Sequence, residues 1–421
     1  MDDLKDSMRK DSKKFLAGVA TVAIVGAGLS GVSCVRLAKR LGKKVLLSEV
    51  NKDIPREIVA ELKNLGAELE LGRHSKEFLQ RAELIIVSPG VDTTGFRDAY
   101  LGSKPIPLVG EIEFAYWFCK SKDIIAITGT NGKTTTTFVI ADILKQNTGR
   151  RVHVLGNIGE PFASGVSQID RDDYVVLEIS SFQLETIDTF RPHLGCLLNL
   201  APDHLDRYPD MESYFQAKKR LFLNQDESDF AFFAASLAGR LADIKAAQRA
   251  VEAEDNISFI KQALAVYGID PKAVDAYLTA FKGLSHRFEF VQTKRGVRFI
   301  NDSKATNIAS TIFALKKIDD PVILIAGGLD KGLDYSQILP FVKGIRRIVL
   351  IGQARQKIRD GLGEAVAMED AHSLEEAVAL AFGQAREGDT VLLSPMCASF
   401  DMFKNYKERG EVFKRAVREL I

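Results

Sequence analysis

Glycine, lysine and hydroxyl side chains cluster in the segment Thr128–Thr135, which reads TGTNGKTT. Glycines at a turn between a strand and a helix let backbone N–H groups point at one anion, and the start of the helix adds positive potential. Lys133 supplies a full charge for the outer phosphates of a nucleotide, and Thr134 supplies a hydroxyl for Mg²⁺. The segment therefore predicts a nucleoside triphosphate site. Ile127 replaces the first glycine of the usual G-x-x-x-x-G-K-[ST] motif, so a simple tight turn is the alternative.

A carboxylate and an imidazole form a second candidate set. Glu178 lies near the end of one apolar run, and His204 follows another. Beside a triphosphate loop these side chains suit a divalent ion, which stabilises the charge of a transferring phosphoryl group. His204 alone fits a hydrogen-bonded turn equally well, but the neighbouring acids Asp203 and Asp206 favour a functional role. Lys218 lies on a predicted helix, and its residue type and position alone favour an exposed surface site.

Polar residues also follow three apolar runs in the last third of the chain. Asp302 and Lys304 follow the first run, Lys331 follows the second, and Ser399 follows the third. Because the carboxyl ends of parallel strands meet at one edge of a sheet, the topology predicts that these loops converge there. Two ammonium groups and a hydroxyl suit a small substrate that carries carboxylates.

A glycine-rich turn near the N-terminus has the pattern Gly26-x-Gly28-x-x-Gly31, and Glu49 ends the next apolar run. This is the layout of a dinucleotide-type fold, in which an acid about 20 residues further on binds ribose hydroxyls. An NAD-dependent oxidoreductase is therefore an alternative, but it leaves the triphosphate loop unexplained. The loop Ser88–Val91 follows a third apolar run, where ligands sit in open α/β sheets.

Apolar runs that alternate with helical segments predict a parallel sheet in each of three α/β parts. The first predicted strand begins at Thr21. The others span Lys44–Ser48, Leu84–Val87, Ile124–Ile127, Tyr174–Ile179, Leu194–Leu200, Val297–Ile300, Val322–Ala326, Arg347–Ile351 and Thr390–Ser394. The predicted helices include Thr136–Lys145, Met211–Leu223 and Leu374–Arg386. The alanine-rich stretch Asp229–Glu254 is predicted to be a connecting helix.

The bulk properties exclude several classes of protein. A chain of 421 residues with 46% hydrophobic residues is long enough for two or three domains with proper cores. A net charge of +1 gives no sign of a nucleic-acid partner. The four cysteines are scattered without a C-x-x-C pair, which predicts reduced thiols in the cytoplasm. No apolar run reaches transmembrane length and the N-terminus lacks the apolar region of a signal peptide, so we expect no membrane association.

Taken together, the motifs of the chain resemble those of the Mur ligase family. They occur in the family's order over nearly the whole chain: GAGLSG at Gly26, SPGV at Ser88, GTNGKTT at Gly129, GNIG at Gly156, LEISSFQLE at Leu177, DHLDRY at Asp203, AKKR at Ala217, FKGLSHRFE at Phe281, NDSKATN at Asn301, GGLDKGLDY at Gly327 and SPMCASFDMFKNYKERG at Ser394. The strings SSFQLE and SPxxASFDxFxNxxxRG are most similar to those of the family members that add D-glutamate.

The resemblance implies an α/β fold of three domains. After a lead-in at 1–19, these are a Rossmann-like UDP-substrate domain at 20–119, a central P-loop-type ATPase domain at 120–285 and a Rossmann-like amino-acid domain at 286–421. It implies a monomeric ligase of peptidoglycan synthesis that uses ATP and Mg²⁺. Such a ligase joins D-glutamate to UDP-N-acetylmuramoyl-L-alanine through an acyl phosphate, and its last domain swings to close the site.

The resemblance also assigns roles to individual residues of this chain. The uridine nucleotide would be held by Leu29, Ser30, Glu49, Asn51 and the Ser88–Gly90 loop, which includes Gly90, and the muramoyl part by Asn157. ATP would be held by Gly129, Thr130, Asn131, Gly132, Lys133, Thr134, Thr135, Asn256, Arg287 and Asp302. Mg²⁺ would be held by Thr134, Glu178, His204 and a carbamylated Lys218, the last three acting with Lys133 in catalysis. D-Glutamate would be held by Lys304, Thr306, Lys331, Ser399, Phe400 and Tyr406.

Two regions depart from the family pattern. The interval Asn224–Asp255 is shorter than the corresponding part of the family, which usually carries extra strands there. In the motif that follows, Asn256 matches but Asp255 and Phe259 replace a histidine and an asparagine, so adenine recognition is expected to differ. Phe259 is expected to be a core residue rather than a stacking platform. The alternatives are an impaired nucleotide-binding relative, or a Mur ligase of different amino-acid specificity.

Overall fold

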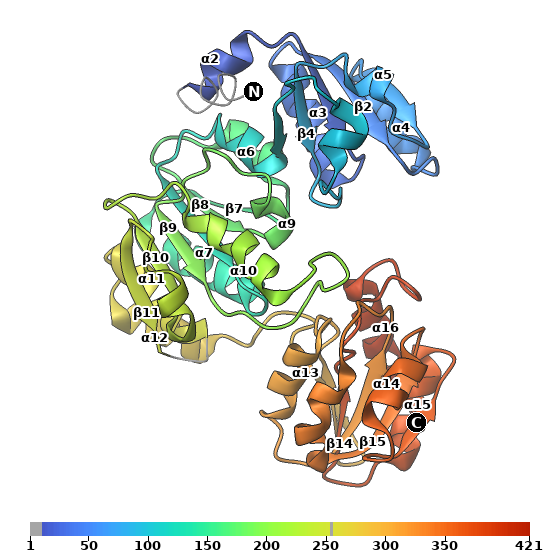
Figure 1. Ribbon diagram of the computed structural model, residues 1–421. Helices are drawn as coiled ribbons and strands as arrows, with labels where there is room; N and C mark the ends of the chain where they lie inside the picture. Colours follow the sequence, from blue (N-terminus) through green and yellow to red (C-terminus); the bar gives the residue numbers. More distant parts are fainter. Residues whose placement is uncertain (1–10, 253–255) are drawn as a thin grey trace. The chain divides into compact units, whose positions relative to one another are not determined.

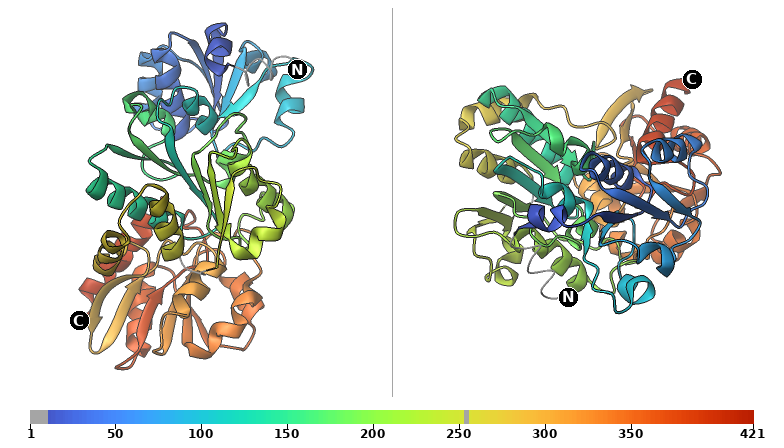
Figure 2. Two further views of the ribbon diagram at one scale, coloured as in Figure 1. Left: turned by 90° about the vertical axis from the view of Figure 1, so that its left-hand side faces the viewer. Right: turned by 90° about the horizontal axis from the view of Figure 1, so that it is seen from above.

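The computed structural model describes residues 11–252 and 256–421, which contain three β-sheets flanked by helices (Figures 1 and 2). These residues belong to two compact units. The first unit combines Met1–Asn199 with Tyr214–Thr279, and the second combines Leu200–Ser213 with Ala280–Ile421. The predicted α/β architecture with parallel sheets is confirmed. No helix of the described ranges has both the length and the apolar character needed to cross a bilayer.

The first sheet is entirely parallel and has the strand order β3-β2-β1-β4-β5. Its strands are β1 (Thr21–Val25), β2 (Lys44–Glu49), β3 (Glu68–Leu71), β4 (Leu84–Val87) and β5 (Leu108–Gly110), with helices α3 (Leu29–Arg40), α4 (Arg56–Asn64), α5 (Lys76–Leu79) and the π-helical turn η1 (Arg97–Leu101). Central β1 is buried because both faces of the sheet are covered. The connections leave β1 in opposite directions, so β1 and β4 create a switch point where ligands bind in such sheets.

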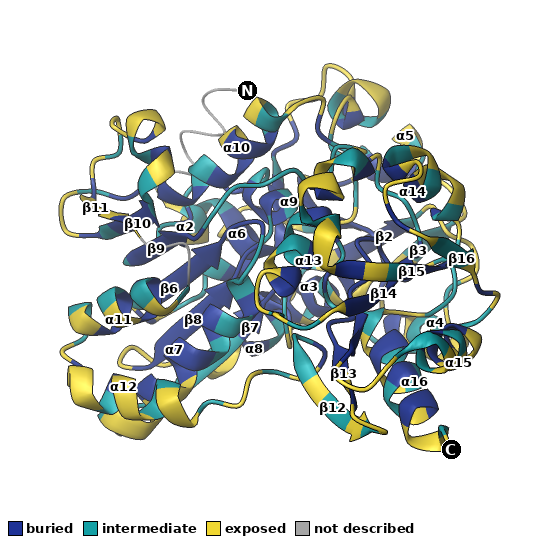
Figure 3. Cartoon of the chain, turned by 90° about the horizontal axis from the view of Figure 1, so that it is seen from below, coloured by how far each residue is buried: buried dark blue, intermediate teal, exposed yellow. Residues whose placement is uncertain are grey.

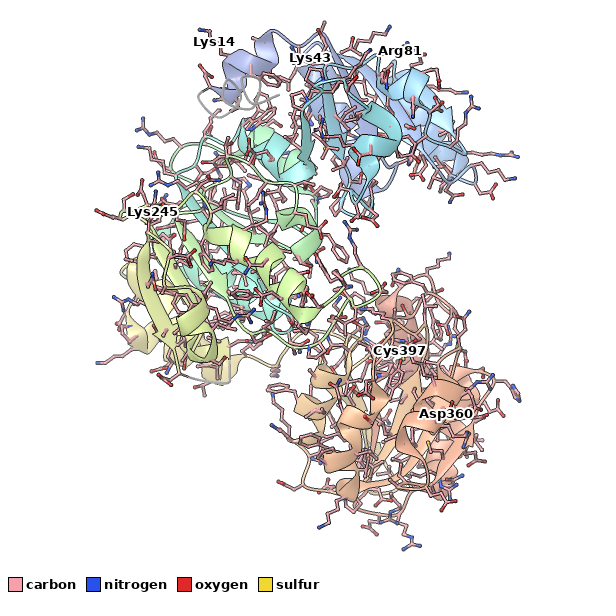
Figure 4. The ribbon with its side chains drawn as sticks, in the orientation of Figure 1. Lys14, Lys43, Arg81, Lys245, Asp360 and Cys397 are labelled. Atoms are coloured by element: carbon pink, nitrogen blue, oxygen red, sulfur yellow. The ribbon has the colours of Figure 1, made fainter. Side chains whose placement is uncertain are left out.

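Helix α2 (Ser12–Ala17) precedes this sheet and is fixed to it. The Asp11 side chain caps the helix by accepting a hydrogen bond from the Lys14 N–H. The Lys43 ammonium, labelled in Figure 4, donates to the carbonyl oxygens of Leu16 and Val19 at 2.7 and 2.6 Å. The end of the predicted lead-in is therefore ordered against the first sheet. The first ten residues lie outside the described residues.

The second sheet is also entirely parallel, with the order β11-β10-β9-β6-β8-β7. Its strands are β6 (Asp123–Thr128), β7 (Val152–Gly156), β8 (Tyr174–Glu178), β9 (Leu194–Leu197), β10 (Phe230–Ala234) and β11 (Ala247–Val251). Its helices are α6 (Glu111–Tyr116), α7 (Lys133–Thr148), α8 (Phe162–Gly165), α9 (Ser181–Leu184), α10 (Met211–Lys219), α11 (Asn256–Val266) and α12 (Pro271–Ala280), with the 3₁₀ turns η2 (Val166–Gln168), η3 (Arg220–Phe222) and η4 (Ala235–Arg240).

The prediction of a connecting helix at Asp229–Glu254 is wrong. Its described part, 229–252, contains β10, the 3₁₀ turn η4 and β11, so it adds two strands to the sheet, and the last two residues of the stretch lie outside the described residues. The side chains of Phe232 and Phe233 are almost fully buried, and this burial outweighs the helix propensity of the surrounding alanines. Strand β11 is the exposed edge of the sheet, shown largely in yellow in Figure 3. The shortened interval therefore retains sheet structure.

The third sheet has the order β12-β13-β17-β14-β15-β16, and only β12 is antiparallel to its neighbour. Its strands are β12 (Glu289–Lys294), β13 (Val297–Asn301), β14 (Val322–Gly327), β15 (Ile345–Ile351), β16 (Met368–Asp370) and β17 (Thr390–Leu393). Its helices are α13 (Ile308–Leu315), α14 (Arg355–Leu362), α15 (Leu374–Gln384) and α16 (Tyr406–Glu419), with the 3₁₀ segment η5 (Tyr335–Gly344). Hydrophobic clusters on both faces bury β14 completely.

Glu113 on α6 is expected to be a major determinant of the stability of the first unit. The carboxylate is fully buried and accepts hydrogen bonds from the backbone N–H groups of Asp188, Thr189 and Phe190 at 2.8–2.9 Å, and from Trp117 Nε1 at 2.8 Å. Glu113→Ala should lower the free energy of unfolding by about 3 kcal/mol or more, because several buried donors lose their acceptor. The fluorescence of Trp117, the single tryptophan of the chain, reports this transition during urea denaturation.

Glu61→Ala is the control for this substitution. Glu61 pairs with Arg36 at 2.6 Å, but both side chains are more than a third exposed, so its loss should cost less than about 1 kcal/mol. Equal effects of the two substitutions would contradict the role assigned to Glu113.

Candidate active site

The nucleotide-sugar candidates lie at the carboxyl edge of the first sheet. Gly26 has φ +97°, and a Cβ on Gly31 would lie 1.9 Å from the Gly26 carbonyl oxygen, so the turn and α3 require both glycines. The Glu49 carboxylate accepts hydrogen bonds from the N–H groups of Ala27 at 2.7 Å and Asn51 at 2.8 Å. The first glycine turn and the end of β2 are therefore joined, as a nucleotide-binding edge requires.

The other predicted residues of this edge differ in exposure: Ser88 is buried and Ser30 is partly buried, whereas three others are exposed. Leu29 is 77% exposed at the start of α3, and Gly90 and Asn51 are also exposed. Ser88 Oγ donates to the Gly26 carbonyl oxygen at 3.3 Å, which brings the loop after β4 against the glycine turn. An exposed leucine beside this polar edge offers an apolar surface to a ligand.

The phosphate loop of the second sheet has the predicted strand–turn–helix form. It connects β6 to α7, with Gly129 at φ +147° and Gly132 at φ +81°, and both values favour glycine. A Cβ on Gly132 would lie 2.2 Å from Asn256 Nδ2, so the amide at the start of α11 lies against the loop. Asn256 is thus close to the position predicted for ATP. Phe259, one turn further, is 1% exposed and is a core residue, as expected.

Asn199 holds the phosphate loop in place and was not predicted from the sequence. Its Oδ1 accepts a hydrogen bond from the Asn131 N–H at 2.9 Å, and its Nδ2 donates to the Asn131 carbonyl oxygen at 3.1 Å. The Thr130 N–H donates to the backbone carbonyl oxygen of Asn199 at 3.2 Å. The predicted strand Leu194–Leu200 ends early, at Leu197, and the following residues turn toward the loop. Asn199 follows β9, which pairs with β6, and this position next to the phosphate loop is the sequence feature that could have predicted its role.

Two lysines converge on one carbonyl oxygen of this loop. Lys133 Nζ donates to the carbonyl oxygens of Gly129 and Thr130, both at 2.8 Å. Lys218 Nζ donates to the same Gly129 oxygen at 3.0 Å and lies 4.5 Å from the centroid of the Tyr214 ring. Lys218 is only 1% exposed, so the expectation from residue type alone, an exposed lysine, is wrong. Lys133 is partly buried and Lys218 is buried, so two positive charges lie beside this loop.

Glu178 joins the phosphate loop to the loop after β7. This buried carboxylate accepts hydrogen bonds from Thr134 Oγ1 at 2.6 Å and Asn157 Nδ2 at 2.9 Å. A carboxylate beside a hydroxyl at a phosphate loop fits Mg²⁺, which protein sites commonly bind through one or two carboxylates, water and substrate phosphates. The described ranges contain no group of three or more His, Cys, Asp or Glu side chains that could hold a metal ion. Water and substrate phosphates would therefore have to supply the other ligands of Mg²⁺.

His204 belongs to the second unit, on the segment Leu200–Ser213. Its φ of +57° is unusual for a residue other than glycine. The neighbouring Asp203 is 5% exposed and accepts a hydrogen bond from Lys331 Nζ at 3.2 Å. Burial alone would raise the pKa of the Asp203 carboxyl, but the charges of Lys331 and His204 outweigh burial and hold this pKa at about 2. Asp203 is therefore an anion in the folded protein at neutral pH.

The amino-acid candidates lie on three loops at the carboxyl edge of the third sheet. The loops follow β13, β17 and β14, which are neighbours in that order. Leu329 and Ala398 exchange backbone hydrogen bonds of 2.9 and 3.2 Å, which joins the loop of Lys331 to the loop of Ser399. Lys304 Nζ lies 4.3 Å from the centroid of the Tyr406 ring. The expected convergence of these loops is thus observed within the second unit.

Within this edge the predicted residues differ in accessibility. Ser399 is 2% exposed, whereas Phe400 beside it is 69% exposed. Thr306 is partly buried, and its N–H donates to the Lys304 carbonyl oxygen at 2.8 Å. Arg287 is also partly buried, and the neighbouring Asp302 is 9% exposed.

Arg409 fastens two of these loops together, although the sequence assigned it no role. Its guanidinium is fully buried and donates to Ser303 Oγ and the Ser303 carbonyl oxygen at 3.0 and 2.8 Å. It also donates to the carbonyl oxygens of Cys397 and Ala398 at 3.1 and 3.3 Å. Burial lowers the pKa of Arg409 to about 10, so the group stays charged at neutral pH. Figure 4 labels Cys397, one of the residues that it holds.

Asp302 is expected to make the stability of the second unit depend on pH. Burial raises its pKa to about 7, against hydrogen bonds from the Phe288 N–H at 3.1 Å and Ser394 Oγ at 3.0 Å. Since the folded state holds the proton more tightly than the unfolded chain, this contribution is greatest below about pH 4 and is lost as the pH rises to about 7. Asp302→Asn should therefore remove up to about 3 kcal/mol of the stability change between pH 5 and pH 8.

Urea denaturation of wild type and Asp302→Asn at pH 5 and pH 8, monitored by circular dichroism, measures this difference in the free energy of unfolding. Glu111 of the first unit has a pKa raised to about 7 by burial and stays unchanged in the variant, so some pH dependence remains in both proteins. An identical loss of stability in wild type and Asp302→Asn would contradict the assignment.

Comparison with known proteins agrees with this geometry. Three family models match: Mur ligase MurD-like, N-terminal domain, at residues 20–99; Mur ligase middle domain at 127–300; and Mur ligase, glutamate ligase domain, at 286–397. The UDP-N-acetylmuramoylalanine--D-glutamate ligase of Thermoanaerobacter sp. (strain X514) is 40% identical over 447 positions, which cover 95% of this chain and 98% of that enzyme. This alignment is longer than the 421 residues of the chain, which therefore lacks segments of that relative.

More distant proteins share the fold. The ligase of the same name from Chloroherpeton thalassium (strain ATCC 35110 / GB-78) is 38% identical and covers 94% of this chain and 98% of its own length. The MurF ligase of Thermotoga maritima, solved in complex with ADP, superposes with a TM-score of 0.59 at 14% identity, covering 89% of this chain and 95% of its own. Similarity over 95% of the chain, together with three matching family models, shows that the chain belongs to the Mur ligase family.

Proposed function

We propose that this protein is an ATP-dependent ligase that adds D-glutamate to UDP-N-acetylmuramoyl-L-alanine in peptidoglycan synthesis. The observation that carries the proposal is 40% identity to a ligase of that name over 95% of the chain. The phosphate loop supports ATP as the energy source, because the Lys133 ammonium and the start of α7 lie at the glycine turn and favour a bound phosphate. The carboxyl edge of the third sheet carries Lys304 and Lys331, which supports a substrate amino acid with two carboxylates.

The first step transfers the γ-phosphoryl group of ATP to the L-alanyl carboxylate. A free carboxylate is a poor acylating agent at neutral pH, so it needs a phosphate as leaving group. Lys133 neutralises the phosphate oxygens whose negative charge crowds the site during this transfer. Asn199 keeps the loop in the form in which its N–H groups point at the phosphates. Asn256 lies against Gly132 and is assigned to the nucleotide.

Mg²⁺ fits the donor set on the phosphate loop. Thr134 and Glu178 would hold it together with phosphate oxygens, and His204 and Lys218 complete the proposed set. When bound, the ion would neutralise part of the negative charge on the oxygens of the phosphoryl group. Lys218 is assigned as a carbamate, because an ammonium cannot bind a cation and a carbamate oxygen can. Its buried position beside Gly129 supports a role in the site rather than on the surface.

In the second step the amine of D-glutamate attacks the acyl phosphate, and phosphate leaves. Lys304 and Lys331 are assigned to the carboxylates of D-glutamate, with Thr306, Ser399, Phe400 and Tyr406 completing the pocket. Arg287 and Asp302 are assigned to ATP from the same part of the chain. The uridine nucleotide is assigned to the edge of the first sheet at Leu29, Ser30, Glu49, Asn51 and Gly90, and the muramoyl part to Asn157. We further propose a cytoplasmic monomer with domains at 20–119, 120–285 and 286–421.

An omission experiment tests this function. Phosphate release from ATP should require UDP-N-acetylmuramoyl-L-alanine, D-glutamate and Mg²⁺ together, and omission of any one should reduce the rate to background. L-Glutamate, D-aspartate and L-alanine serve as controls at the concentration of D-glutamate. Equal rates with these amino acids would contradict the proposed specificity, and phosphate release without the uridine substrate would contradict the proposed reaction.

A further inference from the structure

Asp203 is a buried carboxylate, and among the described residues its hydrogen-bond donors all belong to the second unit. Oδ1 accepts from Lys331 Nζ at 3.2 Å and from the His204 N–H at 3.0 Å, and Oδ2 accepts from Asn307 Nδ2 at 3.0 Å. The His204 Nε2 lies 3.8 Å from Oδ2, beyond hydrogen-bond distance. With three donors and 5% exposure, Asp203 is satisfied without solvent and has one defined position.

The donors to Asp203 come from separate parts of the second unit. Asn307 is the N-cap of α13, and its Oδ1 accepts from the Ser310 N–H at 2.9 Å. Both polar atoms of the amide are therefore hydrogen-bonded, Oδ1 to the helix and Nδ2 to Asp203. Lys331 lies on the loop that follows β14, and Asp203 lies on the segment Leu200–Ser213. The carboxylate therefore ties a lysine of the amino-acid edge to a rigid helix start.

Lys331 has donors left over after this contact. An ammonium group carries three N–H donors, and Asp203 is the acceptor that takes one of them in the described structure. The Lys331 side chain is 15% exposed, so the remaining donors lie close to solvent. A lysine side chain loses much rotamer freedom when its end is held, and a held ammonium does not lose that freedom again when a ligand binds.

We propose that Asp203 is a positioning residue that fixes the Lys331 ammonium for a carboxylate of D-glutamate. This inference rests on the proposed function and adds a residue to it. The alternative role for Asp203 is to compete with the substrate carboxylate for Lys331. The number of N–H donors favours positioning, because one ammonium group can bind Asp203 and a second carboxylate at the same time. Asp203 acts through Lys331 and makes no contact of its own with D-glutamate.

Steady-state kinetics of Asp203→Asn test the proposal. The substitution keeps the size of the side chain and removes the charge that holds Lys331. The KM for D-glutamate should rise about ten-fold, the factor that corresponds to freeing one lysine side chain. The KM values for ATP and the uridine substrate should change less than about two-fold, since Lys331 is not assigned to either. Asp206→Asn is the matched control: it removes the same charge from an exposed residue of the same segment, and all three KM values should stay unchanged.

A double-mutant cycle shows whether the effect passes through Lys331. In a Lys331→Met background, Asp203→Asn should cause no further rise in the KM for D-glutamate. If Asp203→Asn unfolds, Asp203→Glu replaces it, and a smaller rise in the same KM is expected because the charge is kept on a longer side chain. An unchanged or lower KM for D-glutamate in an active Asp203 variant, or a full further rise in the Lys331→Met background, would overturn the inference alone. Wild-type protein without D-glutamate-dependent phosphate release would overturn the proposed function as well.

Discussion

Lys218→Ala should lower kcat about a thousand-fold while the protein stays folded. Lys218 is buried beside the phosphate loop, with Nζ 3.0 Å from the Gly129 carbonyl oxygen, and no surface role accounts for that position. Removal of a charged group that faces a transferring phosphoryl group typically costs a factor of 10² to 10³ in kcat. The fold should persist, because the substitution also removes a buried charge that is costly to desolvate. Phosphate release and circular dichroism measure the two properties.

The neighbouring lysine provides a matched control. Lys219 pairs at 2.7 Å with Asp243, whose side chain is 70% exposed, so Lys219→Ala should retain full activity. Added bicarbonate should restore nothing in Lys218→Ala, because the variant has no amine to form a carbamate. Lys218→Ala protein that retains most of its activity would show that the lysine is structural.

Arg409→Ala is expected to have the largest effect on the stability of the amino-acid edge. The guanidinium donates four hydrogen bonds from a fully buried position, and its loss leaves the carbonyl oxygens of Ser303 and Cys397 without that donor. Each unsatisfied buried acceptor costs about 1–3 kcal/mol, so a loss of about 4 kcal/mol is expected. The loops after β13 and β17 should separate. Hydrogen exchange of peptides covering 301–307 and 394–405 should therefore rise strongly.

A lysine at this position should not restore the structure. Arg409→Lys keeps the charge but lacks the planar fork that reaches two loops at once, so it should recover only part of the lost protection. Arg415→Ala is the control on the same helix, because Arg415 is 59% exposed and pairs with Glu375 at 3.4 Å. Exchange rates in Arg409→Ala equal to those of the control would contradict the role of Arg409.

The sequence predicts structure correctly where it depends on neighbouring residues or on strand order. The strand, the glycine turn and the helix of the phosphate loop lie within one continuous stretch, and all three are observed, with α7 extending from Lys133 to Thr148. The convergence of the loops of Lys304, Lys331 and Ser399 followed from the parallel order of their strands. In both cases chain direction and strand alternation fix the result before any long-range contact is known.

Long-range packing explains the failures. The stretch that contains β10 has residues that suit either a helix or a buried strand, and its pairing with β9, over 30 residues earlier, decides the outcome. The burial of Lys218 depends on which face of α10 meets the phosphate loop, and residue type alone does not give that face. Asn199 and Arg409 are single polar residues without a distinguishing motif. Their roles appear only when the loops that they join are seen together.

The fate of one oxygen atom tests most directly whether the carboxylate attacks the γ-phosphoryl group. The uridine substrate is prepared with ¹⁸O in its L-alanyl carboxylate and is converted with ATP, Mg²⁺ and D-glutamate. An acyl phosphate passes one of these oxygens to phosphate when the amine of D-glutamate displaces it, so mass spectrometry should find one ¹⁸O in the released phosphate. Amide product accompanied by unlabelled phosphate would contradict the mechanism.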